Sequence, residues 1–395
     1  MAVKACFLGS ARYSHPLDGT NRKKFRVLKP LGEMFVIGFS RDVYPRRFTE
    51  HAHFYLLPQI PLSTLRYMEA FVLGQLLTCW VIFRHGVRVI VTQSPYEGFA
   101  AALAKKVAGW VGCRVALVVE THGDFEESVF MQRRVVFPKL YRFLMRHVVG
   151  FTLKHADAMR TISNSTRRQL EQWVRGRPIV QFPAWTDIEV FLETGRSERN
   201  THAPEILYTG VLIPRKGVHH LIKAFASVAD HFSQARLVIV GHEENKAYAA
   251  GLKEDVEQFG LKERVKFVSV VSQEELARRM GRACTLVLPS LSEGLGRVVV
   301  EAMATGTPVV GSKVGGIQEM VQDGSTGFLV PPGDEASLAE RLQWLLEHPG
   351  EAEQMGKKGH DFAQRYFSTE TFVRGYGQIF DTAQTMLAEN REHAP

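Results

Sequence analysis

The sequence predicts an α/β protein made of two doubly wound, parallel-sheet domains that face a central cleft. Its 395 residues are enough for two domains, and 45% of them are apolar, which is the globular average. Short apolar runs alternate with amphipathic helical patterns along most of the chain. This βαβα alternation is typical of parallel sheets that bind ligands at the carboxyl ends of their strands.

The first half of the chain contains five runs that look like strands. They span residues 3–9, 34–39, 87–92, 114–120 and 158–163. The most hydrophobic stretch of the chain, residues 71–83, lies between the second and third of these runs. A membrane-spanning helix needs about 20 apolar residues, so we interpret this stretch as a buried helix and expect no transmembrane segment.

The second half alternates more regularly between strands and helices. Six strands are expected at residues 205–210, 236–241, 265–268, 285–289, 307–311 and 327–330. Helical spacing follows at 218–232, 274–283, 297–304 and 367–388. The polar segment 193–204 has no periodicity and is expected to link the domains, which places them at 1–195 and 205–372.

The charge of the chain is unevenly distributed. Residues 1–195 hold 27 Lys and Arg against 15 Asp and Glu, whereas the remainder holds 22 against 26. This asymmetry favours an anionic partner for the first half: a membrane surface, an acidic substrate or nucleic acid. No nucleic-acid recognition motif accompanies the charge, so we expect no nucleic acid. The alternative is a basic surface without a dedicated partner.

The compartment is expected to be the reducing cytoplasm. The four cysteines are far apart and form no CxxC pair, which argues against a disulfide framework or a zinc cluster. The apolar core of the N-terminal segment is too short for a signal peptide.

Chemistry concentrates in residues 289–310. A strand ends at Pro289, and the following loop carries Glu293, Gly294 and Gly296 before a helix that presents Glu301. The small residues let a ligand approach the backbone, and the N–H groups at the helix start favour a phosphate. Carboxylates suit a polyol, because each accepts hydrogen bonds from two hydroxyls.

A phosphate beside Glu293 requires a cation. Lys216 supplies it from the loop 210–217, which follows the first strand of the second half and opens at the same edge of the sheet. Arg215 is adjacent and is expected to help. A lone lysine would be interpreted as a solvated surface charge. Only its position at this sheet edge makes Lys216 a candidate phosphate-binding residue.

These runs resemble a known family. Residues 290–310 read S-x-x-E-G-x-G-x-x-x-x-E-A-M-A-x-G-x-P-V-V, which is similar to the E-x7-E signature of the retaining family 4 glycosyltransferases of the GT-B fold. Further similar runs lie at 210–217, 265–276 and 314–330, in the family's order and spacing. The resemblance implies two Rossmann-like domains. In this fold the last helix commonly crosses back, so residues from about 373 to 395 are expected to join the first domain.

The resemblance also implies roles for these residues. Glu301 would hold the ribose hydroxyls of a nucleotide sugar, and Glu293 would hold the transferred sugar. The diphosphate would be bound by Lys216, Arg215 and the backbone of Gly294, Leu295 and Gly296. The family needs no metal, and the chain has no DxD motif; residues 124–126 come nearest, but their second acid is glutamate.

The first half resembles the family more loosely, as an acceptor-binding domain. His122 follows a strand where many members place a histidine that faces the cleft, and it would contact the donor sugar or its phosphates. Gly19 lies where relatives often have a glycine loop after the first strand, and is assigned to donor binding. An isolated histidine is more often a surface or core residue without a function. Only its position within the family resemblance favours a functional role for His122.

The resemblance therefore implies a metal-independent, retaining hexosyltransferase. It would use a nucleotide-diphosphate sugar as co-substrate, with no separate cofactor, and a glycan or lipid-linked acceptor, as in polysaccharide biosynthesis. The alternatives are a nucleotide-sugar epimerase and a non-catalytic nucleotide-sugar-binding subunit of the same fold. A pyridoxal-type phosphorylase is usually far longer, and an NAD dehydrogenase is disfavoured because no GxGxxG follows the first strand.

Residues 131–154 carry six Lys or Arg and no acid. On a helix that begins near Pro138, the basic Lys139, Arg142 and Arg146 share one face. A largely separate face carries apolar residues: Leu140, Phe143, Leu144, Val148 and Phe151. This pattern is typical of an interfacial helix that docks on an anionic membrane from the cytoplasmic side. The alternative is that the apolar stripe packs on its own domain.

Overall fold

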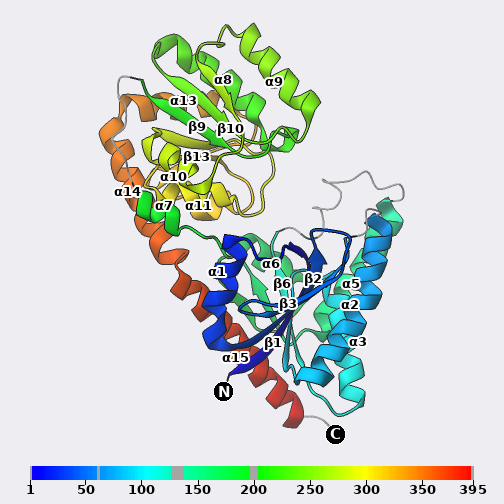
Figure 1. Cartoon of the computed structure of the whole chain (residues 1–395). Coiled ribbons are helices and arrows are strands. Elements are labelled where there is room, and N and C mark those ends of the chain that lie inside the picture. The colour runs from blue at the N-terminus through cyan, green and yellow to red at the C-terminus, as the bar shows by residue number, and fades with distance from the viewer. Residues whose placement is uncertain (1, 60–62, 124, 126–137, 196–202, 393–395) are drawn as a thin grey trace. The chain divides into compact units, whose positions relative to one another are not determined.

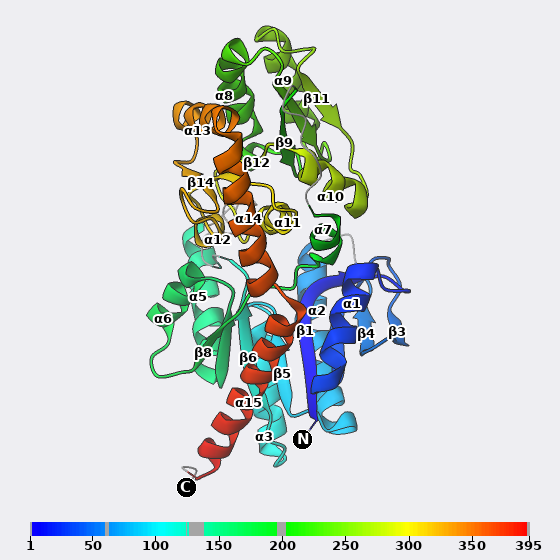
Figure 2. The same ribbon diagram turned by 90° about the vertical axis from the view of Figure 1, so that its left-hand side faces the viewer.

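The computed structural model describes residues 2–59, 63–123, 125, 138–195 and 203–392 (Figures 1 and 2). Its contacts divide the chain into two units. Unit 1 comprises Met1–Trp185 and Thr369–Pro395, and unit 2 comprises Thr186–Ser368. The helix α7 (Glu189–Thr194), which the sequence analysis placed in the first domain, lies in unit 2 because Phe191 is buried in that unit's core.

Unit 1 is built on an eight-stranded sheet in the order β3-β4-β2-β1-β5-β6-β7-β8. Its neighbouring strands pair in parallel, except that β3 and β4 are antiparallel. The strands are β1 (Val3–Tyr13), β2 (Gly32–Ser40), β3 (Arg46–Thr49), β4 (His53–Leu57), β5 (Val89–Thr92), β6 (Ala116–Thr121), β7 (Ala158–Thr161) and β8 (Ile179–Gln181). Chain order reverses between β1 and β5, which makes that point the topological switch of the sheet.

Helices cover both faces of this sheet because its strands are apolar on both sides. Phe7 of β1 faces a core that includes Phe25 of α1 and Tyr376 of α15. Its neighbour Leu8 faces the opposite core, which includes Ile82 of α2 and Ala101 of α3. The helices of the unit are α1 (Gly19–Leu28), α2 (Ser63–His85), α3 (Gly98–Trp110), α5 (Pro138–His155), α6 (Asn164–Trp173) and α15 (Thr369–Glu392), with a 3-10 turn at Lys29–Leu31.

The C-terminal helix α15 packs against β5, β6, β7 and β8 of unit 1. Figure 2 shows it in red along this sheet. Its buried residues Phe372, Tyr376, Ile379 and Phe380 recur at helical spacing, so one stripe of the helix enters the core.

Unit 2 contains a six-stranded parallel sheet in the order β11-β10-β9-β12-β13-β14. Its strands are β9 (Glu205–Thr209), β10 (Arg236–Val240), β11 (Val265–Val268), β12 (Thr285–Leu288), β13 (Val309–Ser312) and β14 (Gly327–Val330). The helices are α7, α8 (Val218–His231), α9 (Lys246–Gln258), α10 (Gln273–Arg282), α11 (Arg297–Ala304), α12 (Ile317–Met320), α13 (Glu335–Glu347) and α14 (Pro349–Tyr366), with a 3-10 turn at Pro214–Lys216. The switch point here lies between β9 and β12.

One interpretation of the sequence is wrong. The stretch 71–83 does form a helix, α2, but it is not buried on all sides. Its exposed apolar side chains are Val72, Leu73, Leu76, Trp80 and Phe83. Hydrophobic composition indicated the helix but not whether a neighbouring element covers each of its faces.

Candidate functional site

Two loops of unit 2 meet at the carboxyl ends of β9 and β12. The Leu291 N–H donates to the Arg215 carbonyl (2.8 Å), which joins the loop after β9 to the loop after β12. Gly217 adopts the left-handed conformation (φ +66°), and a Cβ there would lie 2.1 Å from the Pro289 carbonyl oxygen. Only glycine permits this approach, so the switch point of the sheet carries one continuous loop surface.

Lys216 and Glu293 pair directly on this surface. The Lys216 ammonium donates to Glu293 Oε2, and the two side chains are only 13% and 12% exposed. Ser290 Oγ also donates to Glu293 Oε2 (3.3 Å), and the Arg215 guanidinium donates to the Ser292 carbonyl (2.7 Å). Lys216, Arg215 and Glu293 were predicted to share one sheet edge, and the structure brings them together there. A part-buried ion pair of this kind holds a cation and a carboxylate where a ligand can compete for both.

The helix α11 begins beside this pair. Gly296 is its N-cap in the left-handed conformation (φ +73°), and Leu295 and Gly294 precede it in the loop. The positive end of the helix dipole therefore lies at the loop assigned to the diphosphate. Glu301, further along α11, is 8% exposed, and burial raises its pKa even though Arg297 opposes this shift. Burial of a carboxyl group without hydrogen bonds is unfavourable, so hydroxyl groups of a ligand that donate hydrogen bonds to Glu301 would stabilise it.

Gly315 and Gly316 also belong to the site, although they were not predicted from the sequence. They follow β13, and the Gly316 N–H donates to the Gly294 carbonyl (2.6 Å). Gly315 is left-handed (φ +48°), and a Cβ there would lie 1.7 Å from the Glu293 carbonyl oxygen. The glycine pair in the run 314–330 was the available signal, because adjacent glycines often mark a close backbone contact.

Replacing Gly315 by alanine is expected to disturb the site more than the same change at Gly324. Both glycines are left-handed, which costs alanine about 1–2 kcal/mol, but a Cβ at Gly324 meets nothing within 4 Å. Gly315→Ala also overpacks the Glu293 backbone, adding about 1–3 kcal/mol. Urea unfolding and nucleotide titration of both variants measure the difference. Equal effects would show that the loop around Glu293 is not held by this contact.

A second cluster lies at the carboxyl edge of unit 1. His122 follows β6 and is 39% exposed, and its Nε2 is 3.0 Å from Glu120 Oε2. The buried Glu120 also pairs with Arg160 (3.0 Å) and accepts from the Tyr376 hydroxyl (2.7 Å). Burial raises the pKa of Glu120, but Arg160 and the His122 bond outweigh it and hold that pKa well below its ordinary value. His122 was predicted from the sequence but its partner Glu120 was not, although an acid near the end of an apolar strand was a signal.

Glu97 is a further residue that the sequence analysis missed. It lies between β5 and α3, and its Oε1 accepts from the Ser10 N–H of β1 (2.7 Å), so it joins the two strands of the switch point. Burial raises its pKa, and His122 is among the groups that oppose this shift.

Gly19, which was assigned to donor binding from the sequence, begins α1, where it is exposed and a Cβ would meet nothing within 4 Å. No steric contact therefore requires glycine at this position.

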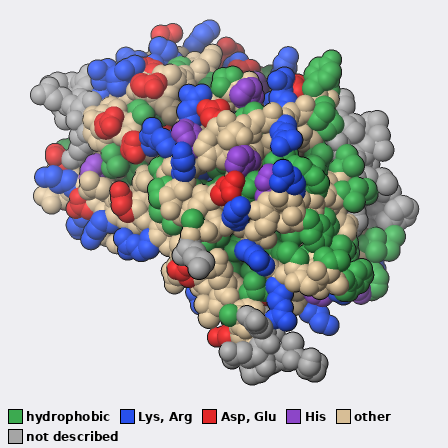
Figure 3. Space-filling model, turned by 60° about the horizontal axis from the view of Figure 1, so that its bottom comes forward, with side chains coloured by type: hydrophobic (Ala, Val, Ile, Leu, Met, Phe, Trp, Pro, Cys, Tyr) green, Lys and Arg blue, Asp and Glu red, His purple; other side chains and the backbone are tan. Residues whose placement is uncertain are grey.

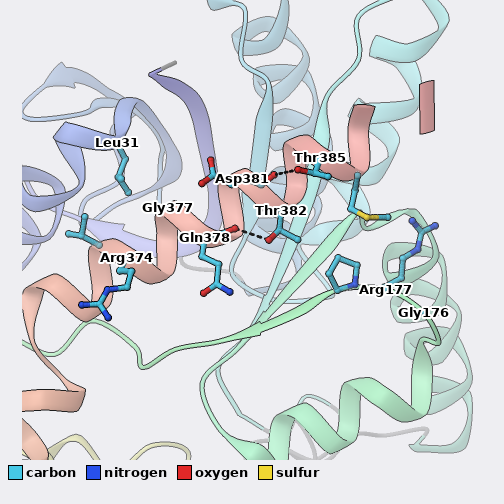
Figure 4. A pocket seen from close by; sticks show the side chains of 12 residues that line it. Leu31, Gly176, Arg177, Arg374, Gly377, Gln378, Asp381, Thr382 and Thr385 are labelled. Carbon is cyan, nitrogen blue, oxygen red and sulfur yellow. Dashed lines mark hydrogen bonds between the residues drawn. The ribbon is translucent and has the colours of Figure 1, made fainter. Parts of the chain in front are cut away.

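A groove in unit 1 lies away from these residues. It has a volume of about 1060 Å³ and is lined by α15 together with Leu31 and residues 176–178 (Figure 4). Leu31 precedes β2 and residues 176–178 precede β8, so the groove lies at the amino ends of strands. Ligands of such sheets bind at the opposite edge.

Some predicted features fall outside the described residues: Asp124, Glu126, and the start of the basic segment with Arg133 and Arg134. Among the residues that are described, no three His, Cys, Asp or Glu side chains gather as metal ligands. Within the same residues, no helix is long and apolar enough to cross a bilayer.

Comparison with known proteins identifies the family. Residues 193–362 match the family model described as glycosyl transferases group 1, and residues 28–185 match the glycosyl transferase 4-like domain. The two models together match most of the chain. The chain belongs to the family 4 type of glycosyltransferases, and its two α/β units have the GT-B fold.

The curated relatives match over parts of their length. An uncharacterized glycosyltransferase of Methanocaldococcus jannaschii is 27% identical over 60% of this chain and 62% of its own length. The sulfoquinovosyl transferase of Arabidopsis thaliana is 30% identical over 50% of this chain and 37% of its own. A D-inositol 3-phosphate glycosyltransferase of Streptomyces avermitilis is 32% identical over 45% of this chain and 39% of its own length. The chain thus spans less than two thirds of each of these relatives.

Solved structures match over nearly the whole chain. Sucrose-phosphate synthase from Thermosynechococcus elongatus superposes with a TM-score of 0.75 at 24% identity, covering 97% of this chain and 99% of that one. Anabaena HepE in complex with UDP gives a TM-score of 0.73 at 20% identity, covering 96% and 100%. At such identities the likeness establishes the fold alone.

Proposed function

We propose that this protein is a retaining glycosyltransferase that moves a hexose-type sugar from a nucleotide-diphosphate sugar to a glycan or lipid-linked acceptor. The observation that carries the proposal is the Lys216–Glu293 pair, held beside the start of α11 with the buried Glu301 on the same helix. This arrangement offers a cation, helix-start N–H groups and two carboxyl groups at one sheet edge. A sugar nucleotide needs the first two for its diphosphate and the carboxyl groups for its hydroxyls.

Each residue has a role in this proposal. Glu301 accepts hydrogen bonds from the ribose, which relieves the cost of its burial. Lys216 turns from Glu293 to the diphosphate and stabilises the charge that develops on the leaving group. Glu293, released from Lys216, accepts hydroxyls of the transferred sugar. His122 contacts the donor sugar.

The reaction needs no separate base in this proposal. The bond from the anomeric carbon to the diphosphate oxygen breaks, and a bond from that carbon to the acceptor oxygen forms on the same face. The acceptor's proton passes to the leaving diphosphate oxygen. Front-face transfer of this kind retains the anomeric configuration and requires no metal.

The acceptor is the least constrained part of the proposal. Two of the curated relatives are named for sulfoquinovosyl transfer and for D-inositol 3-phosphate, and they match 50% and 45% of this chain. Anabaena HepE has been solved with UDP and with UDP-glucose, which makes uridine donors the first to test.

Product analysis with several donors tests the proposed reaction. UDP-, GDP- and ADP-hexoses are incubated with and without a glycan or polyprenyl-linked acceptor, and nucleoside diphosphate release and the product's anomeric configuration are measured. The proposal expects acceptor-dependent release and a retained configuration. Conversion of the donor without any acceptor would indicate an epimerase, and binding without turnover would indicate a non-catalytic subunit.

Replacing Glu301 by alanine is expected to weaken nucleoside diphosphate binding about 10- to 150-fold, the equivalent of about 1.5–3 kcal/mol in hydrogen bonds to a charged group. Because burial raises the pKa of Glu301 above glutamate's 4.5, the free protein keeps its proton to higher pH. Ribose hydroxyls favour the carboxylate, so binding releases that proton and the affinity rises as pH increases through the raised pKa. Calorimetric titration in buffers of different ionisation enthalpy measures this release. Glu301→Gln, which cannot release a proton, is the control.

An unchanged affinity in folded Glu301→Ala would remove Glu301 from the ribose site. Equal proton release in wild type and Glu301→Gln would assign the proton to the nucleotide's phosphate instead.

We also propose that unit 1 docks on an anionic membrane surface from the cytoplasmic side. The helix α5 exposes Leu140, Phe143 and Leu144 by 57%, 58% and 49%, so this part of its apolar stripe does not pack on its own unit. The basic residues Lys139, Arg142 and Arg146 lie on the same helix. The helix α2 also exposes apolar side chains, and so do Trp110, the last residue of α3, and Val111, which follows it. Figure 3 shows hydrophobic side chains gathered on the side where Figure 1 places α2, α3 and α5.

Binding to vesicles tests this docking surface. Each basic residue near anionic lipid adds about 1 kcal/mol, so co-sedimentation with anionic vesicles should be strong at low salt and weak at high salt. Arg142→Glu/Arg146→Glu should abolish it, and Phe143→Ser/Leu144→Ser should weaken it. The control is Arg167→Glu/Arg168→Glu on α6. Equal binding to neutral and anionic vesicles, or none to either, would contradict the proposal.

A further inference from the structure

The contact between His122 and Glu120 belongs to a buried network rather than to the surface. The two oxygens of Glu120 have different partners: Oε2 faces His122 Nε2, whereas Oε1 faces the Arg160 guanidinium and the Tyr376 hydroxyl. Arg160 is 1% exposed and also donates to the Pro183 carbonyl (2.7 Å). The carboxylate is therefore held from three sides, by β6, β7 and α15.

Both partners of Oε1 donate to it. A guanidinium has no acceptor, and the Tyr376 hydroxyl donates to the carboxylate. Glu120 beside Arg160 is ionised, and an ionised carboxylate only accepts. The ring atom that faces Oε2 must therefore carry a hydrogen, which places the proton of neutral His122 on Nε2 and leaves a lone pair on Nδ1.

We propose that Glu120 is a positioning residue that fixes the Nε2–H tautomer of His122, so that neutral His122 accepts a hydrogen bond from a hydroxyl of the donor sugar through Nδ1. This inference rests on the proposed function for the role of His122, and it deepens that role. It assigns His122 to a sugar hydroxyl and not to the diphosphate, because a bare Nδ1 is repelled by phosphate oxygens and matched by a hydroxyl donor.

Glu120→Gln tests the assignment because the network dictates how the glutamine amide is oriented. Its oxygen must stay toward Arg160, since an amide NH₂ there would face a guanidinium, which cannot accept a hydrogen bond. The NH₂ group then faces His122 Nε2, which must become the acceptor, and the proton moves to Nδ1. Glu120→Gln thus reverses the tautomer while it nearly preserves the shape of the side chain.

Tyr376→Phe is the matched control. It removes a hydrogen bond from the same carboxylate, at the same depth, without touching the atoms that face His122. Nitrogen-15 NMR of histidine-labelled protein reads the tautomer directly, and His122→Asn identifies the signal of this ring among the 15 histidines. Thermal unfolding and steady-state kinetics of each variant separate stability from turnover.

The expected result is an Nε2–H ring in wild type and in Tyr376→Phe, and an Nδ1–H ring in Glu120→Gln. Turnover in Glu120→Gln should fall roughly tenfold or more, as when the carboxylates that orient metal-binding histidines are replaced. Tyr376→Phe should keep both its donor KM and its turnover near the parental values. An unchanged tautomer in folded Glu120→Gln, or an equal loss of turnover in Tyr376→Phe, overturns the inference.

Failure of the proposed function looks different. If no nucleotide sugar is transferred by wild type, or if His122→Asn transfers at the parental rate, then the catalytic role of His122 is wrong. In that case the NMR comparison still decides whether Glu120 fixes the ring.

Discussion

Replacing Lys216 by methionine is expected to lower kcat/KM for sugar transfer by about 10²–10³-fold, the cost of removing one preorganised donor from a developing oxyanion. Lys216 and its partner Glu293 are both nearly buried, so their charges are poorly screened by water. In the proposed reaction, the variant loses the cation that would neutralise the leaving diphosphate, and it leaves Glu293 as an unpaired carboxylate that would repel the same group. Steady-state kinetics with the preferred donor measures both effects.

Lys223→Met is the control for this change. Lys223 pairs with Glu335 at 3.2 Å, but the two side chains are 43% and 35% exposed, and an exposed pair contributes little. Lys223→Met should therefore retain kcat/KM. A Lys216→Met enzyme with parental kcat/KM would show that the cation of the donor site lies elsewhere.

Replacing Arg160 by leucine is expected to destabilise the protein by about 3–5 kcal/mol, because it leaves the Glu120 carboxylate buried without its cation. Arg160 also donates to the Pro183 carbonyl, so the change leaves that carbonyl without this hydrogen bond as well. Urea unfolding measures the loss. The control is Arg167→Leu, which breaks the exposed pair of Arg167 with Glu171 on α6 and should cost less than about 1 kcal/mol.

The same network predicts how stability depends on pH. In the folded protein the pKa of Glu120 lies well below glutamate's 4.5: burial raises it, but Arg160 and His122 lower it by more. The stabilisation is therefore present above pH 4.5 and is lost as pH falls toward the folded pKa. Arg160→Leu should remove this acid-side loss. An unchanged acid profile in the variant would show that Glu120 and Arg160 are not coupled in solution.

Much of unit 2 was predictable because buried parallel strands are short, continuous apolar runs. The strands β11 and β14 match their predicted bounds, and the other four agree within two residues. Three strands of unit 1 were missed. The strands β3 (RRFT) and β8 (IVQ) lie at the edges of the sheet, where burial on one side leaves no long apolar run. The strand β4 (HFYLL) was missed although it is apolar.

The candidate site was predictable where its residues lie on loops that follow strands of one parallel sheet. Lys216 and Glu293 lie on loops that follow strands, so topology alone brings them to one edge. The partners of Glu120 were not accessible in this way, because Arg160 lies on β7 and Tyr376 lies on α15, more than 200 residues from Glu120 in the chain. A single sequence cannot reveal such a pairing.

Nucleoside diphosphate binding tests the central claim, that the switch point of unit 2 holds a sugar nucleotide through Lys216 and Glu301. Thermal unfolding is followed with UDP, GDP and ADP for wild type, Lys216→Met, Glu301→Ala and His122→Ala. At a hundred times its Kd, the correct nucleotide stabilises the wild type by about 2.7 kcal/mol. The prediction is that His122→Ala keeps this stabilisation while Lys216→Met and Glu301→Ala lose most of it. Stabilisation of all four proteins to the same extent would contradict the claim.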